Sequence, residues 1–205
     1  MTDHTVRDPE ALEALYGEVN EVSALKEISY LHSVYAAFVA AAPFAVLATT
    51  GPHGLDASPR GDAPGFVEIV DDRTLLMADR RGNNRIDSLR NIIADPQVAL
   101  LFMIPGIGET LRVNGTAEIS VDPELIARFT IDRKPPRTML VIHIESVFFQ
   151  CSRALIRAEL WNPDKQTPRS ALPSTGEMLA AVTHDRINAE TYDRELPPRL
   201  KATLY

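Results

Sequence analysis

The sequence predicts an α+β fold that is mainly β, an antiparallel barrel with short helices at both ends of the chain. Six or seven segments have the apolar or alternating composition of strands, and most of them follow one another as hairpins. Only one helix intrudes among the strands, whereas a parallel doubly wound sheet needs a helix between successive strands. With 205 residues, of which 45% are hydrophobic, the chain can bury one sizeable core.

Two helices are expected before the barrel. Asp8 precedes a proline at the first helical position, which is typical of a capped helix start, and that helix should continue to about Val19. A second helix should run over residues 30–42 and end at Pro43. We expect these helices to cover an opening or a face of the barrel.

The strand region begins at Phe44 and ends at Gln150. Its clearest segment alternates strictly, with Leu111, Val113 and Ala117 among the residues on the face predicted to be core. Asp122 before Pro123 predicts a further short helix. The predicted strands are residues 44–50, 56–61, 66–70, 74–78, 97–103, 110–119 and 139–150.

The C-terminal part, residues 164–205, is expected to be helical. Ser174 with Glu177 three residues later forms a capping-box pattern, and a second helical stretch leads into Pro197-Pro198. Such a segment has little reason to fold alone, so it should pack on the barrel or on a second subunit. The predicted organisation is a barrel domain with N-terminal helices, residues 1–163, followed by this extension.

Charge and composition exclude several classes of function. The net charge of -7 argues against nucleic acid or an anionic membrane as the main partner, because both reward a basic surface. The sequence shows neither a secretory leader pattern nor an apolar run that could span a bilayer, so a cytoplasmic protein is expected. Cys151 is the only cysteine and should be a buried, inert thiol, and no histidine has a partner at metal-ligand spacing, so no metal site is predicted.

A cluster of arginines marks the candidate site. Arg80 and Arg81 lie in a turn before a helix predicted over residues 84–94, with Asn83 or Asn84 as its N-cap and Arg85 in its first turn. Free backbone N–H groups at a helix start attract anions, and Arg60 on a nearby strand could add a bidentate contact. The alternative is that these arginines are solvated surface charge, since cations oppose the dipole at a helix start.

Several segments in a fixed order resemble the FMN-binding split β-barrel of the pyridoxamine 5'-phosphate oxidase-like superfamily. The matching pieces are FAVLATT, SPRGD, ADRRGNNRIDSLRNI, ADPQVALLFMIPG, LRVNGTAEIS and CSRALIRAELWNP, which together make up roughly half of the strand-rich region and its flanks. The resemblance implies a Greek-key split barrel, FMN as cofactor, and a homodimer with two flavins at its interface.

The resemblance also implies which residues hold FMN. Asn83, Asn84 and Arg85 would bind the phosphate, Arg60 would contact it or its surroundings, and Asp79 and Arg80 would lie near the ribityl chain. Residues after Arg60 would meet the isoalloxazine edge, and Arg112 and Trp161 would reach a flavin bound mainly by the other subunit. The full set of cofactor-binding residues expected on these grounds is Ser58, Arg60, Gly61, Asp62, Asp79, Arg80, Asn83, Asn84, Arg85, Arg112 and Trp161.

The function implied is that of an FMN-dependent oxidoreductase acting on a small substrate. The arginine-and-histidine signature with which true pyridoxamine phosphate oxidases hold their substrate is not recognisable after Trp161, so the vitamin B6 reaction is not expected. The alternatives are a non-catalytic flavin-binding protein for storage or sensing, or the same barrel holding a deazaflavin or haem.

Overall fold

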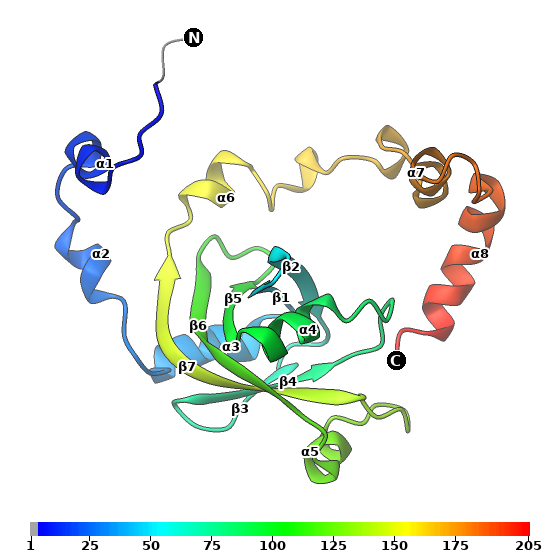
Figure 1. Ribbon diagram of the computed structural model, residues 1–205, viewed down its shortest axis with the longest axis horizontal. Helices are drawn as coiled ribbons and strands as arrows, with labels where there is room; N and C mark the ends of the chain where they lie inside the picture. The colour runs from blue at the N-terminus through cyan, green and yellow to red at the C-terminus, as the bar shows by residue number, and fades with distance from the viewer. Residues whose placement is uncertain (1–3) are drawn as a thin grey trace.

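Seven antiparallel strands form a single sheet in the computed structural model, which describes residues 4–205 of the chain. Residues 1–3, at the start of the predicted barrel domain, lie outside the described part. The order across the sheet is β2-β1-β5-β6-β7-β4-β3 (Figure 1). The strands are β1 (Phe44–Gly51), β2 (Gly54–Gly61), β3 (Val67–Ile69), β4 (Thr74–Asp79), β5 (Gln97–Met103), β6 (Thr110–Ser120) and β7 (Thr138–Gln150).

The sheet curls around the larger of two apolar clusters formed by the described residues. Alternate residues of each long strand point inward, as Leu111 and Val113 on β6 and Leu140 and Ile142 on β7 do, and all four are buried. Val39 of α3 (Ser33–Ala41) is fully buried against the same core. The predicted alternation of residues 110–119 is therefore confirmed, and the inward side chains hold the barrel together by burial of apolar area.

The barrel is split because its two outermost strands do not pair. β2 pairs only with β1 and β3 pairs only with β4 among the strands described. A seam therefore lies between β2 and the edge formed by the short β3 and the end of β4, and the chain crosses it through the connection after Gly61. This arrangement confirms the predicted α+β split barrel, and it leaves polar groups at the seam available for a site.

The N-terminal helices only partly meet expectation. α3 packs on the barrel, but neither α1 (Pro9–Tyr16) nor α2 (Glu21–Leu25) has a buried residue. Both extend away from the sheet (Figure 1). The expectation that the first helix covers the barrel is thus wrong for this chain by itself. Asp8 does cap α1 as predicted, by accepting hydrogen bonds from the backbone of Glu10 and Ala11.

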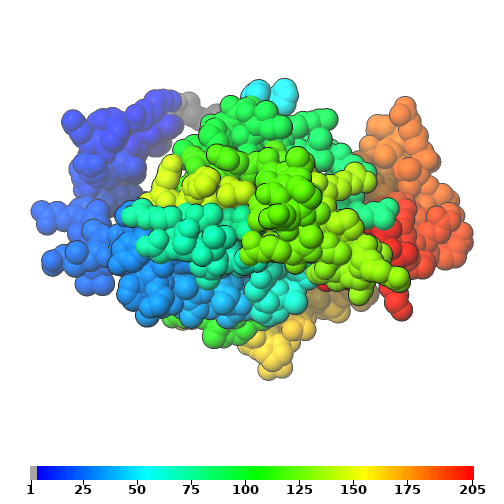
Figure 2. Space-filling model, turned by 90° about the horizontal axis from the view of Figure 1, so that it is seen from below, coloured from blue at the N-terminus to red at the C-terminus, as the bar shows by residue number. Residues whose placement is uncertain are grey.

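The C-terminal segment forms an arc beside the barrel (Figure 1). It contains α6 (Arg153–Arg157), two short 3-10 turns at Pro163–Lys165 and Arg169–Ala171, α7 (Thr175–Val182) and α8 (Ala189–Ala202). The capping box of Ser174 and Glu177 is confirmed, and α7 packs on α8. The helix α8 continues through Pro197-Pro198. Proline has no backbone N–H, so the carbonyls of the preceding turn lose their helical partners. Both prolines are exposed, so water can reach these carbonyls. Figure 2 shows the N-terminal and C-terminal segments on opposite sides of the molecule.

Two further helices lie within the barrel sequence. α4 (Asp87–Ala94) follows β4 and packs on β1, and α5 (Pro123–Arg128) follows β6 with Asp122 as its cap, as predicted. Among the helices of residues 4–205, none combines the length and the apolar composition needed to cross a bilayer.

A β-bulge in the longest ladder gives the first prediction. The register of β6 and β7 shifts between Asn114 and Gly115, where the Gly115 backbone lies so close to the His143 carbonyl that a Cβ atom would collide with it. Gly115→Ala should therefore lower the free energy of unfolding by about 1–3 kcal/mol, the usual cost of overpacking. Urea unfolding measures the difference.

The control is Gly82→Ala, because a Cβ atom there meets open space. That variant should change the free energy of unfolding by less than about 0.5 kcal/mol, as surface substitutions usually do. Equal losses in the two variants would contradict the close approach at the bulge.

Candidate functional site

A cavity of about 890 Å³ opens at the seam of the barrel. Its walls come from β2, the end of β4, the loop 80–86, the start of α4 and the loop 133–137 before β7. These segments are far apart in sequence, and the sheet order brings them together because β7 lies beside β4. The cavity therefore depends on the complete barrel.

The inner face of β2 supplies one wall. Asp56, Ser58 and Arg60 alternate along the strand and pair in register with inward-facing residues of β1. One Nη of Arg60 donates hydrogen bonds to Ser58 Oγ at 2.5 Å and to the Pro59 carbonyl at 3.1 Å, while its Nε is buried with no hydrogen-bond partner. A buried guanidinium N–H without a partner is costly, so this position favours an added acceptor.

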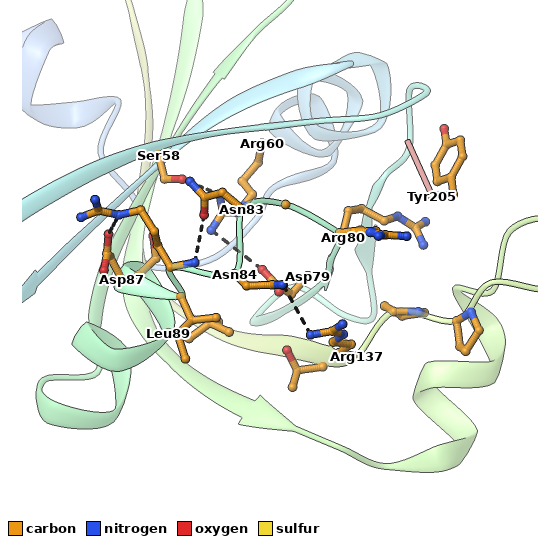
Figure 3. A pocket seen from close by; sticks show the side chains of 18 of the residues that line it. Ser58, Arg60, Asp79, Arg80, Asn83, Asn84, Asp87, Leu89, Arg137 and Tyr205 are labelled. Carbon is orange, nitrogen blue, oxygen red and sulfur yellow. Dashed lines mark hydrogen bonds and ion pairs between the residues drawn. The ribbon is translucent and has the colours of Figure 1, made fainter. Parts of the chain in front are cut away.

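Asp79 stands opposite, at the end of β4. Its Oδ1 is 4.0 Å from the second Nη of Arg60, so the pair spans the seam. Burial raises the pKa of Asp79, and the positive charges of Arg60 and Arg137 partly offset this effect. In Figure 3 Arg60, Asp79 and Arg137 lie around the middle of the pocket, although they come from different elements.

The loop after β4 differs from the prediction. The helix begins at Asp87, and its N-cap is Ile86, which makes no capping hydrogen bond, so the expectation that Asn83 or Asn84 caps the helix is wrong. The Asn83 side chain instead accepts a hydrogen bond from the Arg85 backbone. Ile86 adopts the left-handed region with φ +53°, which is strained for a β-branched residue.

The later start of the helix changes where an anion could be held. Arg85 lies before the helix rather than in its first turn, and its Nε pairs with Asp87 at 2.7 Å on an exposed surface. The carboxylate of Asp87 already complements the helix dipole, so the helix start is a poor anion site. Any anion in the cavity must be held mainly by the side chains of the loop and of β2.

Two hydrogen bonds fix α4, and with it the end of the loop. The buried Ser88 donates to Asp56 at 2.8 Å, and the Asn91 side chain donates to Thr49 Oγ1 at 3.0 Å. Both bonds tie the helix to β1 and β2 rather than to β4. The loop 80–86 therefore stretches between the two sides of the seam and carries its arginines across the cavity.

The loop 133–137 was missed in the sequence. It brings Arg133, Lys134 and Arg137 to the cavity, and Arg137 donates to Asn84 Oδ1 at 3.4 Å. The run DRKPPR is a visible signal, because three basic residues beside two prolines precede a long strand. Only the pairing of β4 with β7 shows that this run faces the arginine loop.

Most of the predicted site residues meet at this seam. Asp62 and Gly61 line an adjoining cavity of about 440 Å³, which shares Arg60, Asp79 and Arg80 with the larger one. The larger cavity is lined by seven of the predicted residues, namely Ser58, Arg60, Asp79, Arg80, Asn83, Asn84 and Arg85.

Arg112 and Trp161 lie elsewhere. The Arg112 side chain is on the outer face of the sheet, with its guanidinium 4.0 Å from the centre of the Phe148 ring. Trp161 donates its indole N–H to the Ile107 carbonyl at 2.8 Å and lines a third, separate cavity. Neither residue lines the seam cavity of its own chain. Cys151 also lies outside this cavity and is exposed, so the expectation of a buried thiol is wrong.

The charge of the cavity indicates what it can bind. Among the described residues, seven basic side chains line it against three carboxylates, in a protein whose net charge is -7. Such a concentration of positive charge at one place favours an anionic ligand, and guanidinium groups suit phosphate or carboxylate in particular.

Comparison with known proteins gives one family. The family model for pyridoxamine 5'-phosphate oxidase matches residues 31–151, which span the barrel from α3 to the end of β7. None of the curated proteins matches the chain.

Several solved structures are similar to part of the chain. A variant of HupZ from Group A Streptococcus has 17% identity and a TM-score of 0.49, covering 58% of this chain and 99% of its own. General stress protein 26 from Bacillus anthracis has 17% identity and a TM-score of 0.43, covering 56% and 88%. A protein from Clostridium acetobutylicum related to general stress protein 26 has 14% identity and a TM-score of 0.45, covering 57% and 84%.

The raised pKa of Asp79 gives a pH prediction. The folded protein releases this proton less readily than the unfolded chain, so the contribution of Asp79 to stability falls as the pH rises from the ordinary value of 3.8 through the raised value. Asp79→Asn removes this dependence. The free energy of unfolding of the variant minus that of the wild type should increase over this interval and then level off.

Urea unfolding between about pH 3.5 and pH 7 would measure that difference. The exposed Asp164, changed to Asn, provides the baseline for removing a carboxylate outside the cavity. A difference that decreases with pH would mean that Arg60 and Arg137, and not burial, dominate at Asp79.

Proposed function

The chain belongs to the pyridoxamine 5'-phosphate oxidase family, and on this premise we propose that it binds FMN in the seam cavity and acts as an FMN-dependent oxidoreductase on a small substrate. The observation that carries the proposal is the set of basic side chains at the seam, with the buried Arg60 Nε lacking an acceptor. A phosphate monoester would supply an acceptor oxygen for the Arg60 Nε and further acceptors for the other basic side chains.

The residues that would hold FMN divide by position. Ser58 and Arg60 on β2, together with the loop residues Asn83, Asn84 and Arg85, would hold the phosphate. Asp79 and Arg80 at the end of β4 would lie near the ribityl chain. Gly61 and Asp62 line the smaller adjoining cavity, where the edge of the ring system would meet the backbone.

FMN, when bound, supplies hydride or electron transfer. The protein then contributes binding, orientation and positive charge, and needs no acid or base of its own for hydride transfer. Arginines around the cavity favour added negative charge on any bound group. Arg133, Lys134 and Arg137 extend this positive charge along one wall, which favours a substrate that is itself anionic.

A non-catalytic flavin-binding role uses the same cavity and belongs to a different class of function. Turnover of NADPH or NADH by the FMN-loaded protein, with reduction of an added acceptor, would separate the two. A protein that retains FMN and shows no turnover with either donor would favour storage or sensing.

We also propose that the functional unit is a homodimer. The outer face of β2, β1 and β5 is apolar and half exposed, with Leu55 88% exposed and Phe44 36% exposed, and Arg112 stands on its continuation over β6. Among the described residues no helix is seen to cover this face (Figure 1). A second copy packed here would bury the apolar face and would place one subunit's Arg112 near the other subunit.

The first test of the site uses its two central arginines. Arg60→Ala with Arg85→Ala should abolish FMN retention, since each lost charge-assisted bond weakens binding by about tenfold or more. Arg60→Ala alone should have a larger effect than Arg85→Ala alone, because the Arg60 side chain is only 20% exposed whereas the Arg85 side chain is 74% exposed. Titration with FMN, followed by flavin fluorescence, measures both affinities.

Arg157→Ala is the matched control, because Arg157 is an exposed arginine at the end of α6, outside the cavity. It should leave the affinity unchanged, and thermal unfolding should show that every variant is folded. Equal affinities for the wild type and the double variant would refute the assignment.

The dimer has its own prediction. Leu55→Asp places a charge on the exposed apolar face of β2 and should convert a dimer to a monomer, because burying an unpaired carboxylate is costly. Sedimentation velocity at several concentrations measures the mass. Leu172→Asp, at a leucine 62% exposed in the C-terminal segment, is the control and should stay dimeric. A wild type that sediments as a monomer would contradict the proposal.

A further inference from the structure

The end of the chain returns to the seam. The Tyr205 hydroxyl donates a hydrogen bond to Asp62 Oδ1 at 2.8 Å, and the Tyr205 ring lies 5.6 Å from the Arg80 guanidinium carbon. Figure 3 shows Tyr205 beside Arg80 at one side of the pocket, away from Asp87 at the other. A residue 143 positions away from Asp62 thus becomes part of the wall.

Tyr205 docks on a pair that itself spans the seam. Asp62 follows β2 and Arg80 follows β4, and the Arg80 Nε pairs with Asp62 Oδ2 at 3.1 Å. Arg80 also donates to the Phe129 carbonyl at 2.6 Å, and the Asp62 carboxylate is only 8% exposed. The tyrosine therefore meets a carboxylate and a guanidinium that are already fixed, which makes its docking site rigid.

The position of Tyr205 matters because it lines both cavities. The larger and the smaller cavity share Tyr205 together with Arg60, Asp79 and Arg80. Leu204 lines the smaller cavity as well, although 64% of it is exposed. Removing the end of the chain would therefore open the common wall of the two cavities to solvent.

The rest of the C-terminal segment is held mainly by itself. α7 and α8 are tied by the Asp193 carboxylate, which accepts from the Gly176 backbone at 2.7 Å and from the Ser174 hydroxyl. Within residues 163–204, the hydrogen bonds described join residues of this segment to one another, apart from those that the Asp164 and Lys165 backbones donate to the adjacent Asn162. Its far end is thus attached to the barrel through Tyr205 and Leu204, and such a segment can open without disturbing the core.

We propose that residues 163–205 form a strap whose far end docks at the seam and that Tyr205 is its latch, so that release of Tyr205 opens the wall shared by the two cavities and sets the rate at which a bound ligand leaves. The contacts that dock the strap are made within this chain and do not depend on a bound ligand. Its effect on ligand release rests on the proposed FMN site. The hydrogen bond to Asp62 raises the pKa of the Tyr205 hydroxyl above its ordinary value of 10.0, so the hydroxyl stays protonated and able to donate well above neutral pH.

Two variants test the latch. Tyr205→Ala removes the hydroxyl and the ring, and should accelerate FMN release by about tenfold, the factor that corresponds to losing a hydrogen bond to a charged group. Tyr205→Phe keeps the ring over Arg80 and should release FMN at an intermediate rate. Stopped-flow displacement of bound FMN by excess apo-flavodoxin as a trap measures these rates.

A second measurement needs no flavin. Trypsin cleavage after Arg199 and Lys201 reports how often the end of α8 leaves the barrel, and it should be faster in Tyr205→Ala than in the wild type. Tyr192→Phe is the matched control, because Tyr192 stacks on Arg199 within the strap, with 4.6 Å from the guanidinium carbon to the ring centre. It should leave both rates unchanged.

The outcomes separate the strap from the proposed function. Faster cleavage with faster FMN release supports the strap, and FMN release at the wild-type rate in Tyr205→Ala overturns it. If the wild type does not bind FMN, the proposed function fails and cleavage alone decides. Equal cleavage rates in the wild type and in Tyr205→Ala then overturn the strap, and faster cleavage in the variant supports it.

Discussion

The site depends on the failure of two strands to pair. In a closed barrel, β2 would hydrogen-bond to the strand across the seam, and its inward polar residues would be sealed into the core. Here β2 is paired on one side only among the described strands, and ion pairs take the place of a ladder: Arg60 faces Asp79 across the seam, and Asp62 pairs with Arg80. The barrel therefore remains stable through its core while its seam stays polar and open to ligand.

The same seam brings positive charges close together, and their mutual repulsion is unfavourable. Basic residues from β2, from the loop after β4 and from the loop 133–137 face one another around the cavity, and three carboxylates offset them only in part. Mutual repulsion and the unpartnered Arg60 Nε both favour an anion at this place. Ile86 in the left-handed region adds local strain to the loop that carries these charges.

Much of the fold was predictable from the sequence because apolar and polar residues alternate along strands. The segments around β5, β6 and β7 were placed within about two residues, which is the usual uncertainty of an element boundary. The helix caps at Asp8, Asp122 and Ser174 were predictable because each is a local signal of side chain and spacing. The cap of α4 was not, since tertiary bonds from Ser88 and Asn91 set where that helix begins.

The candidate site was only partly predictable for a related reason. Ser58, Arg60 and the loop residues 79–85 stood out because they are clustered in sequence, and they line one cavity as expected. Arg137 and Tyr205 come to the same seam through the pairing of β4 with β7 and through the return of the C-terminal segment. Neither the strand pairing nor the return of the C-terminal segment is visible as a local pattern in the sequence. Contacts between residues this far apart in the chain are therefore seen only in the complete structure.

The most direct test of the central claim, that the seam is a flavin site, is the absorption spectrum of the purified protein together with the mass of any chromophore released on denaturation. The account predicts a flavin spectrum, either as purified or after incubation with FMN and removal of the excess, and the mass of FMN in the released fraction. A colourless protein that takes up no FMN would contradict it, and the arginines of the seam would then serve another anion or none.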